Sequence, residues 1–143
     1  MRLLHDPAFL RLALEALDDR TALAASPLAG LACVAAEGAD AAVGLRTLLI
    51  DVLHELAAAK APRDAEAGRL LVDYYVKRVG SHELIAERLH LSRPTFYRRL
   101  QRGLTLTAER LDELEDLTAR ARRGAAIRDR ETTPGEGRSL GME

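Results

Sequence analysis

The sequence predicts an all-α fold with an N-terminal helical bundle, a helix-turn-helix segment over residues 63–103 and a long C-terminal helix. The 143 residues are rich in Ala, Leu and Arg but include only two Phe, three Tyr and no Trp, which favours helices over sheets. No long segment alternates β-branched and polar residues as a half-buried strand does. Apolar residues instead recur every three or four positions. A chain of this length buries a moderate core, so we expect one domain, or one domain with an appendage.

Residues 1–62 are expected to form the N-terminal bundle. Asp6-Pro7 is an N-cap followed by proline at the first helical position, and it begins a helix that runs to about Leu17. A short helical piece is expected over residues 21–25. The first helix has an apolar face made of Leu10, Ala13, Leu14 and Leu17.

Ser26-Pro27 repeats the cap-plus-proline pattern and predicts a helix to about Ala36. Residues 41–60 then read as a long amphipathic helix. Its buried side is expected to consist of Leu45, Leu48, Leu49, Val52, Leu53 and Leu56. The lone cysteine, Cys33, stands among apolar residues and is expected to be a buried structural thiol.

A break is expected at residues 61–64, followed by a helix over about 65–79. The inner face of that helix carries Leu70, Leu71, Tyr74 and Tyr75, and Gly80 is expected to stop it.

The next stretch reads as two short helices joined by a tight turn. Ser81 is placed as the N-cap of the first, in which Leu84, Ile85 and Leu89 are expected to form an apolar stripe. Ser92 is placed as the cap of the second, and Pro94 falls within its first turn.

In the second helix, Phe96 and Leu100 lie four residues apart on one face, while polar residues point elsewhere. A helix with an apolar inner face and an outer face of arginine, tyrosine and glutamine suits the major groove of DNA.

Residues 76–103 resemble the helix-turn-helix of the sigma-factor region-four and LuxR-like response-regulator class. The matching residues are Ala86, Leu89, Leu91, Ser92, Arg93, Thr95, Phe96, Arg98 and Leu100. His90 departs from the pattern, because family members mostly place a glycine there in the left-handed backbone conformation, which histidine tolerates better than most residues. The resemblance implies a transcriptional regulator that binds DNA.

The charge distribution supports the same interpretation. The chain carries a net charge of −1, but residues 77–102 contain seven basic and two acidic side chains. Positive charge is therefore concentrated in the helix-turn-helix, where neutralising phosphates requires it. A solvated arginine-rich face would give the same count.

Ten residues are predicted to bind DNA. Five are expected to face base edges, since arginine can pair with guanine and glutamine with adenine: Arg93, Thr95, Tyr97, Arg98 and Gln101. The other five are expected at phosphates: Lys77, Arg99 and Arg102 by charge, and Ser81 and Ser92 at helix N-termini.

The helix after the recognition helix is expected over residues 104–123. Leucines and small residues recur in a heptad pattern that includes Leu104, Leu111 and Leu114. This helix either pairs with a second copy in a homodimer or folds back on its own domain. Gly103 would allow a kink before it, and residues 124–143 are expected to be a disordered tail.

Nothing in the sequence indicates catalysis. His5, His54, His82 and His90 are scattered without metal-ligand spacing, no phosphate loop or nucleophile motif occurs, and no cofactor is expected. Without a secretory signal or an apolar span of 18 residues, a cytoplasmic protein with no membrane segment is the default. The function predicted is sequence-specific binding to double-stranded DNA, as a dimer. The alternative is an adaptor that docks RNA polymerase or another protein, or a subunit of a larger assembly, without DNA affinity of its own.

Overall fold

The computed structural model describes residues 8–38 and 40–142, with side chains described through residue 128. None of these residues lies in a strand, so the predicted all-α fold is confirmed. The elements in chain order are α1 (Ala8–Glu15), α2 (Arg20–Ala25), the 3-10 helix η1 (Pro27–Gly30), α3 (Ala32–Ala35), α4 (Ala41–Ala57), α5 (Pro62–Leu71), the π-helical segment η2 (Val72–Val76), α6 (His82–Arg88) and α7 (Arg93–Met142).

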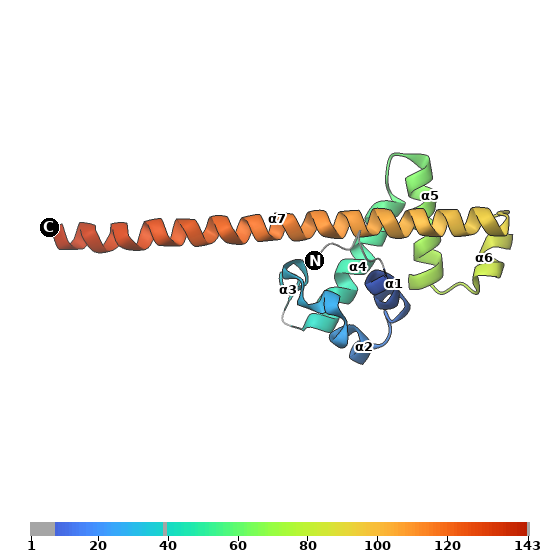
Figure 1. Ribbon diagram of the computed structural model, residues 1–143, viewed down its shortest axis with the longest axis horizontal. Coiled ribbons are helices and arrows are strands. Elements are labelled where there is room, and N and C mark those ends of the chain that lie inside the picture. Colours follow the sequence, from blue (N-terminus) through green and yellow to red (C-terminus); the bar gives the residue numbers. More distant parts are fainter. Residues whose placement is uncertain (1–7, 39, 143) are drawn as a thin grey trace.

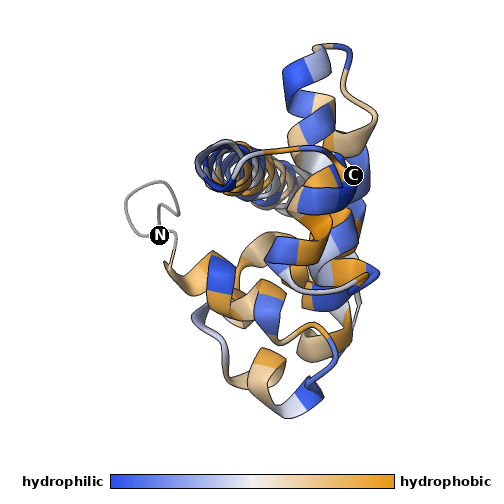
Figure 2. Cartoon of the chain, turned by 90° about the vertical axis from the view of Figure 1, so that its right-hand side faces the viewer, coloured by the Kyte–Doolittle hydropathy of each residue, from blue (hydrophilic) through white to orange (hydrophobic). Residues whose placement is uncertain are grey.

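The long helix α7 organises the molecule. Helices α1, α3, α4, α5 and α6 pack against the N-terminal half of α7, whereas α2 packs against α4. The C-terminal half of α7 extends beyond these helices (Figure 1). Seen nearly end-on in Figure 2, α7 has the other helices on one side only. Next to the start of α5, the first turns of α7 keep an open side, and five of the ten predicted DNA-binding residues lie there.

The first helices bury the side chains that their sequence pattern indicates. Leu10, Ala13, Leu14 and Leu17 are all at most 3% exposed. The predicted cap Asp6-Pro7 lies outside the described residues. The short helix α2 forms as expected, and its N-terminus is capped because the Asp19 carboxylate accepts a hydrogen bond from the backbone amide of Ala22.

The prediction of a single helix from residue 26 to 36 is wrong, because the helix is interrupted at Leu31. Ser26 does cap, since its hydroxyl accepts a hydrogen bond from the amide of Leu28, but η1 ends at Gly30 and α3 starts separately. The side chain of Glu115 in α7 accepts hydrogen bonds from the amides of Ala32 and Cys33, at 3.0 and 2.9 Å. These bonds satisfy the N-terminus of α3 and explain why a new helix can begin there.

Cys33 is buried as expected, and the residue is 5% exposed. Burial, with a hydrogen bond to Glu115, raises the pKa of this thiol to about 12. Burial by itself would raise the pKa of Glu115, but the bonds from the Cys33 and Ala32 amides outweigh it and lower that pKa. Glu115 is therefore a carboxylate that joins α7 to the N-terminal helices.

The break expected at residues 61–64 is wrong in its extent, because α5 already begins at Pro62. Helices α4 and α5 cross closely at Gly68. A Cβ atom added to Gly68 would lie 2.4 Å from the backbone nitrogen of Ala57 and 2.6 Å from the carbonyl carbon of Leu56. Only glycine permits this approach, which brings the start of α5 against α7.

The stop predicted at Gly80 is also wrong, because the left-handed residue after η2 is Arg78, with φ of +50°. The Arg78 guanidinium lies 3.1 Å from the carboxylate of Asp18 and donates a hydrogen bond to the backbone carbonyl of Glu15. These contacts with the α1–α2 connection hold the strained turn in place.

The C-terminal helix differs from the prediction in two ways. No kink occurs at Gly103, which is buried in a continuous α7, where an added Cβ would lie 2.8 Å from the Cδ1 atom of Leu71. Helix α7 also continues to Met142, although residues 124–143 were expected to be disordered; Ala125 and Ala126 favour continuation of the helix.

The heptad leucines of α7 were expected either to pair with a second copy or to pack on their own domain, and their burial distinguishes the two. Leu104 and Leu111 are 4% and 1% exposed, and Leu114 packs against the same core. This helix therefore folds back on its own domain, which is the second of the two alternatives, and Leu104 and Leu111 are not accessible to a second copy. The same core also includes residues of the expected bundle and of the helix-turn-helix, so the two do not form separate packing units.

Candidate nucleic-acid interface

The two serine caps predicted at Ser81 and Ser92 form, and they begin α6 and α7. The Ser81 hydroxyl accepts a hydrogen bond from the Leu84 amide at 3.2 Å and begins α6. The Ser92 hydroxyl accepts from the Thr95 amide at 3.3 Å and donates to the Thr95 hydroxyl at 2.9 Å. The first turn of α7 is therefore fixed by its own side chains.

The turn between the two helices depends on His90. Its φ of +58° lies in the left-handed region, as expected for a position at which proteins of the resembled class mostly have glycine. The amide of Leu91 donates to the carbonyl of Ala86 at 2.8 Å, which closes the end of α6. This backbone geometry sets the angle at which α7 leaves the turn.

Phe96 anchors the first turn of α7, being 1% exposed with its ring edge-on to Tyr74. Ile85 is likewise buried. The prediction that Leu84 and Leu89 form an apolar stripe with Ile85 is wrong, because these two leucines are 41% and 43% exposed. Helix α6 is only seven residues long, and its buried residues are Ile85 and the neighbouring Ala86.

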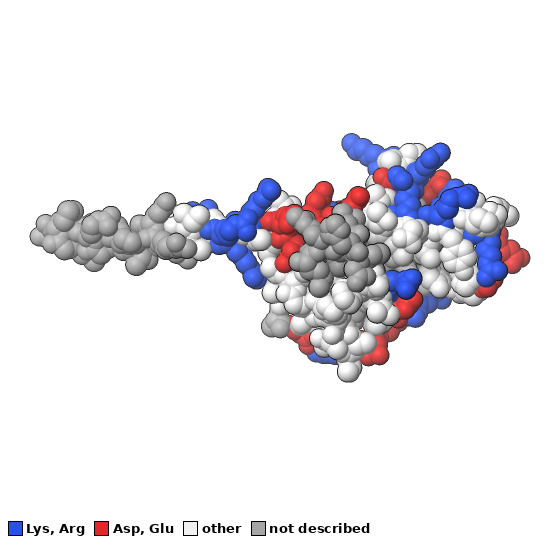
Figure 3. Space-filling model, in the orientation of Figure 1, with Lys and Arg blue, Asp and Glu red and all other residues white. Residues whose placement is uncertain are grey.

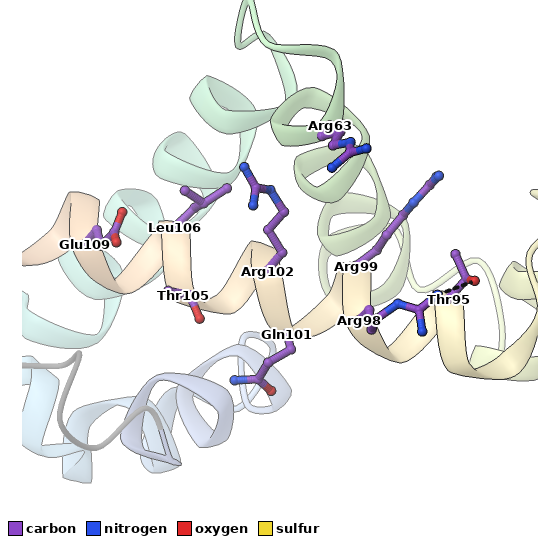
Figure 4. A pocket seen from close by; sticks show the side chains of 9 residues that line it. All are labelled: Arg63, Thr95, Arg98, Arg99, Gln101, Arg102, Thr105, Leu106 and Glu109. Atoms are coloured by element: carbon purple, nitrogen blue, oxygen red, sulfur yellow. Dashed lines mark hydrogen bonds between the residues drawn. The ribbon is translucent and has the colours of Figure 1, made fainter.

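A groove of about 920 Å³ lies on the open side of α7, next to the start of α5. Five of the ten predicted residues line it. Arg99 and Arg102 project from α7 toward the side on which Arg63 projects from α5 (Figure 4). The complete lining is Arg63, Thr95, Arg98, Arg99, Gln101, Arg102, Thr105, Leu106 and Glu109.

Two of the groove arginines are paired with acidic residues of α5. Both Nε and Nη2 of Arg102 donate to Oδ1 of Asp64, at 3.0 and 2.6 Å. The Nη1 atom of Arg99 lies 2.8 Å from Oε2 of Glu66. The pairs are partly open to solvent, with the two arginine side chains 51% and 36% exposed.

Arg98 is held differently, since its Nη2 atom donates to the Thr95 hydroxyl at 3.0 Å. That hydroxyl also receives the bond from Ser92, so the cap and the arginine are linked. Arg98 and Gln101 are both exposed, and the surface on which the DNA-binding prediction rests is accessible.

The other predicted residues do not line the groove. Lys77 and Ser81 are exposed at the connection before α6, and Ser92 reaches the groove only through Thr95. Arg93 instead lines a smaller cavity of about 230 Å³ between α6 and α7. Tyr97 is 41% exposed, with its ring 5.5 Å from that of His82.

A carboxylate also lies close to Arg93. This carboxylate belongs to Glu83, and a hydrogen bond from the backbone amide of Glu83 is the main cause of its lowered pKa. Burial opposes the shift, whereas His82, Ser81 and Arg93 add to it. Glu83 is therefore charged beside Arg93. The Nε2 atom of His82 lies 3.0 Å from Oε1 of Glu83 without the alignment of a hydrogen bond.

Sequence reasoning missed Arg63, which was assigned to the break at 61–64. A signal was present, because Pro62 followed two residues later by Asp64 is typical of the first turn of a helix. Nothing local shows that this helix starts beside α7. Figure 3 shows Lys and Arg gathered over α5 and the start of α7, with acidic side chains among them.

Among the described residues, which exclude His5, no three His, Cys, Asp or Glu side chains are grouped as metal ligands. No helix in the described part of the chain has the length and apolar character needed to cross a lipid bilayer. Comparison of the chain with protein-family models, with curated proteins and with solved structures finds no match.

Proposed function

We propose that this protein is a sequence-specific DNA-binding transcriptional regulator that places the N-terminal turns of α7 in the major groove. The observation that carries the proposal is an accessible groove lined by four arginines and one glutamine at the start of the second helix of a helix-turn-helix. Exposed arginine and glutamine can read base edges, while the remaining positive charge can neutralise phosphates. The resemblance to sigma-factor region four and the LuxR-like class supports the proposal from the sequence.

The proposal is also supported by the rigid placement of the arginine and glutamine side chains at the start of α7. Phe96 is buried and Ser92 caps the helix, so the direction of Arg98 and Gln101 follows from two anchored neighbours. The groove also contains Arg63 from α5, which adds a contact from a second helix. An interface built on rigid helices suits recognition of a rigid duplex.

A dimer on two half-sites would raise affinity, since one recognition helix offers little contact area. Such a dimer must use a surface other than Leu104 and Leu111, because both are buried in the core of the same chain. Light scattering at concentrations above and below the binding constant for DNA would give the mass of the bound form.

A second candidate function is protein docking, in which the helix-turn-helix binds RNA polymerase or another protein and has no DNA affinity. One observation favours it: Leu84, Leu89 and Tyr97 are each more than 40% exposed on this motif. Exposed apolar residues of this size are common at protein interfaces.

Selection of binding sites from a pool of random duplexes tests the proposal. We expect enrichment of one sequence, and a large loss of affinity for it when Arg98 and Gln101 are both replaced by alanine. The control is the pair Arg11→Ala and Arg46→Ala, which removes two exposed arginines from α1 and α4 and so lowers the charge by one unit more than the test variant. Absence of any enriched sequence, with retained binding of a protein partner, would favour the docking function.

A further inference from the structure

Two carboxylates stand at the edge of the arginine groove. Asp64 and Glu66 both belong to the first half of α5, the helix that also contributes Arg63. They contact two of the four groove arginines, Arg102 and Arg99, at 2.6 and 2.8 Å. No sequence motif pointed to them.

These pairs lower the charge that the groove offers to DNA. The four arginines face three carboxylates, which are Glu109 in the lining, Asp64 and Glu66, so the net charge is +1. Non-specific binding to DNA is governed by such charge, because it consists mainly of the release of counterions from phosphates.

The carboxylate bound to each of these two arginines can be replaced by a phosphate. Arginine binds a carboxylate and a phosphate through the same N–H donors, and both arginine side chains here are more than a third exposed. The Glu66 side chain is 37% exposed and that of Asp64 is 24% exposed. Partly exposed ion pairs contribute little to stability, so a phosphate can replace the carboxylate at small cost to the fold.

We propose that Asp64 and Glu66 occupy, in the free protein, the positions that DNA phosphates take in the complex. The inference rests on the proposed function and concerns the regulation of the same groove. Arg63 and Arg98 make the first phosphate contacts, since neither pairs with a carboxylate of any residue that the structure describes. Arg99 and Arg102 then exchange Glu66 and Asp64 for phosphates. The two acids thereby weaken binding to DNA in general and leave the correct site, with its base contacts, favoured.

The test is the double variant Asp64→Asn and Glu66→Gln, measured by fluorescence anisotropy with a labelled duplex of unrelated sequence between 50 and 200 mM salt. We expect affinity to rise roughly tenfold at the lower salt concentration, the combined size of two exposed ion pairs. The slope of log affinity against log salt should stay close to that of the wild type, because the same four arginines neutralise phosphates in both complexes.

Two control proteins separate this role from others. Glu37→Gln with Asp51→Asn changes the net charge by the same amount at exposed positions that do not line the groove. Asp64→Glu with Glu66→Asp keeps both charges and should bind like the wild type. Circular dichroism establishes that each variant is folded.

Three results would overturn the inference. A loss of affinity in the Asn/Gln variant would mean that the acids position the arginines for DNA. An equal gain in the Glu37/Asp51 control would mean that only total charge matters. An unchanged affinity would mean that the acids have no part in binding. If Arg98→Ala leaves binding unchanged as well, the proposed function itself is wrong, so the two failures can be told apart.

Discussion

Replacing Gly68 by alanine tests the packing that brings α5 against the rest of the molecule. Alanine in place of glycine inside a helix would normally stabilise it by about 1 kcal/mol. At Gly68 the new Cβ would lie 2.4 Å from the Ala57 nitrogen, 2.6 Å from the Leu56 carbonyl carbon and 2.7 Å from the Ala57 Cα. All three are backbone atoms, so no side chain can rotate away.

Ordinary contacts of a Cβ atom begin at about 3.4 Å, so α4 and α5 must separate by about 1 Å at their crossing. Forcing an extra methyl group into a packed core costs about 1–3 kcal/mol, and backbone contacts place this site at the upper end. After the propensity gain, we expect a net loss of about 2 kcal/mol. For a domain of this size that corresponds to a fall in Tm of about 6–10 °C.

Thermal and urea denaturation followed by circular dichroism at 222 nm measure this loss. Gly124→Ala is the matched control, because Gly124 is also helical and its added Cβ would meet only Arg128, at 3.4 Å. The control should be unchanged or stabilised, by up to about 1 kcal/mol. Equal stability of Gly68→Ala and the wild type would refute the close crossing of α4 and α5.

Two further predictions concern stability. Glu115→Gln should destabilise the protein by about 1–3 kcal/mol, because it leaves a buried amide at Ala32 or Cys33 without its acceptor. The pKa of Glu115 is lowered in the folded protein, so its contribution is present above the ordinary value of 4.5 and is lost as the pH falls below it. Urea denaturation at pH 7 and pH 3.5 should show the difference between wild type and variant shrinking at acid pH, and a constant difference would contradict this role. At His90, whose φ is +58°, we expect glycine to be more stable than valine by about 1–2 kcal/mol, and equal stabilities would count against the left-handed turn.

Local signals in the sequence identified the start of most helices correctly. Ser81 and Ser92 cap α6 and α7 through hydrogen bonds to amides three residues away, a range that a short sequence pattern contains. The left-handed backbone at His90 is local in the same way. The apolar face of the first helix followed from its periodicity, because a helix of eight residues can bury only one side.

The errors concern contacts between residues far apart in the chain. Glu115 caps α3 across 82 residues, so the break at Leu31 could not be inferred from its neighbours. Gly103 appeared to be a weak point in α7, but its missing side chain is what allows Leu71 to pack there.

The candidate site shows the same limit. Arg98, Arg99, Gln101 and Arg102 follow from one amphipathic helix, and they do line one groove. The contribution of Arg63 depends on where α5 meets α7, which only the fold determines.

The salt dependence of binding to the selected duplex tests the central proposal most directly. With Arg63 and Arg98 making the first phosphate contacts and Arg99 and Arg102 following, log affinity should fall against log salt with a slope of about −3 to −4. Replacing Arg98 and Arg102 by alanine should reduce that slope by about 2. A slope near zero, or one that the double replacement leaves unchanged, would contradict the account.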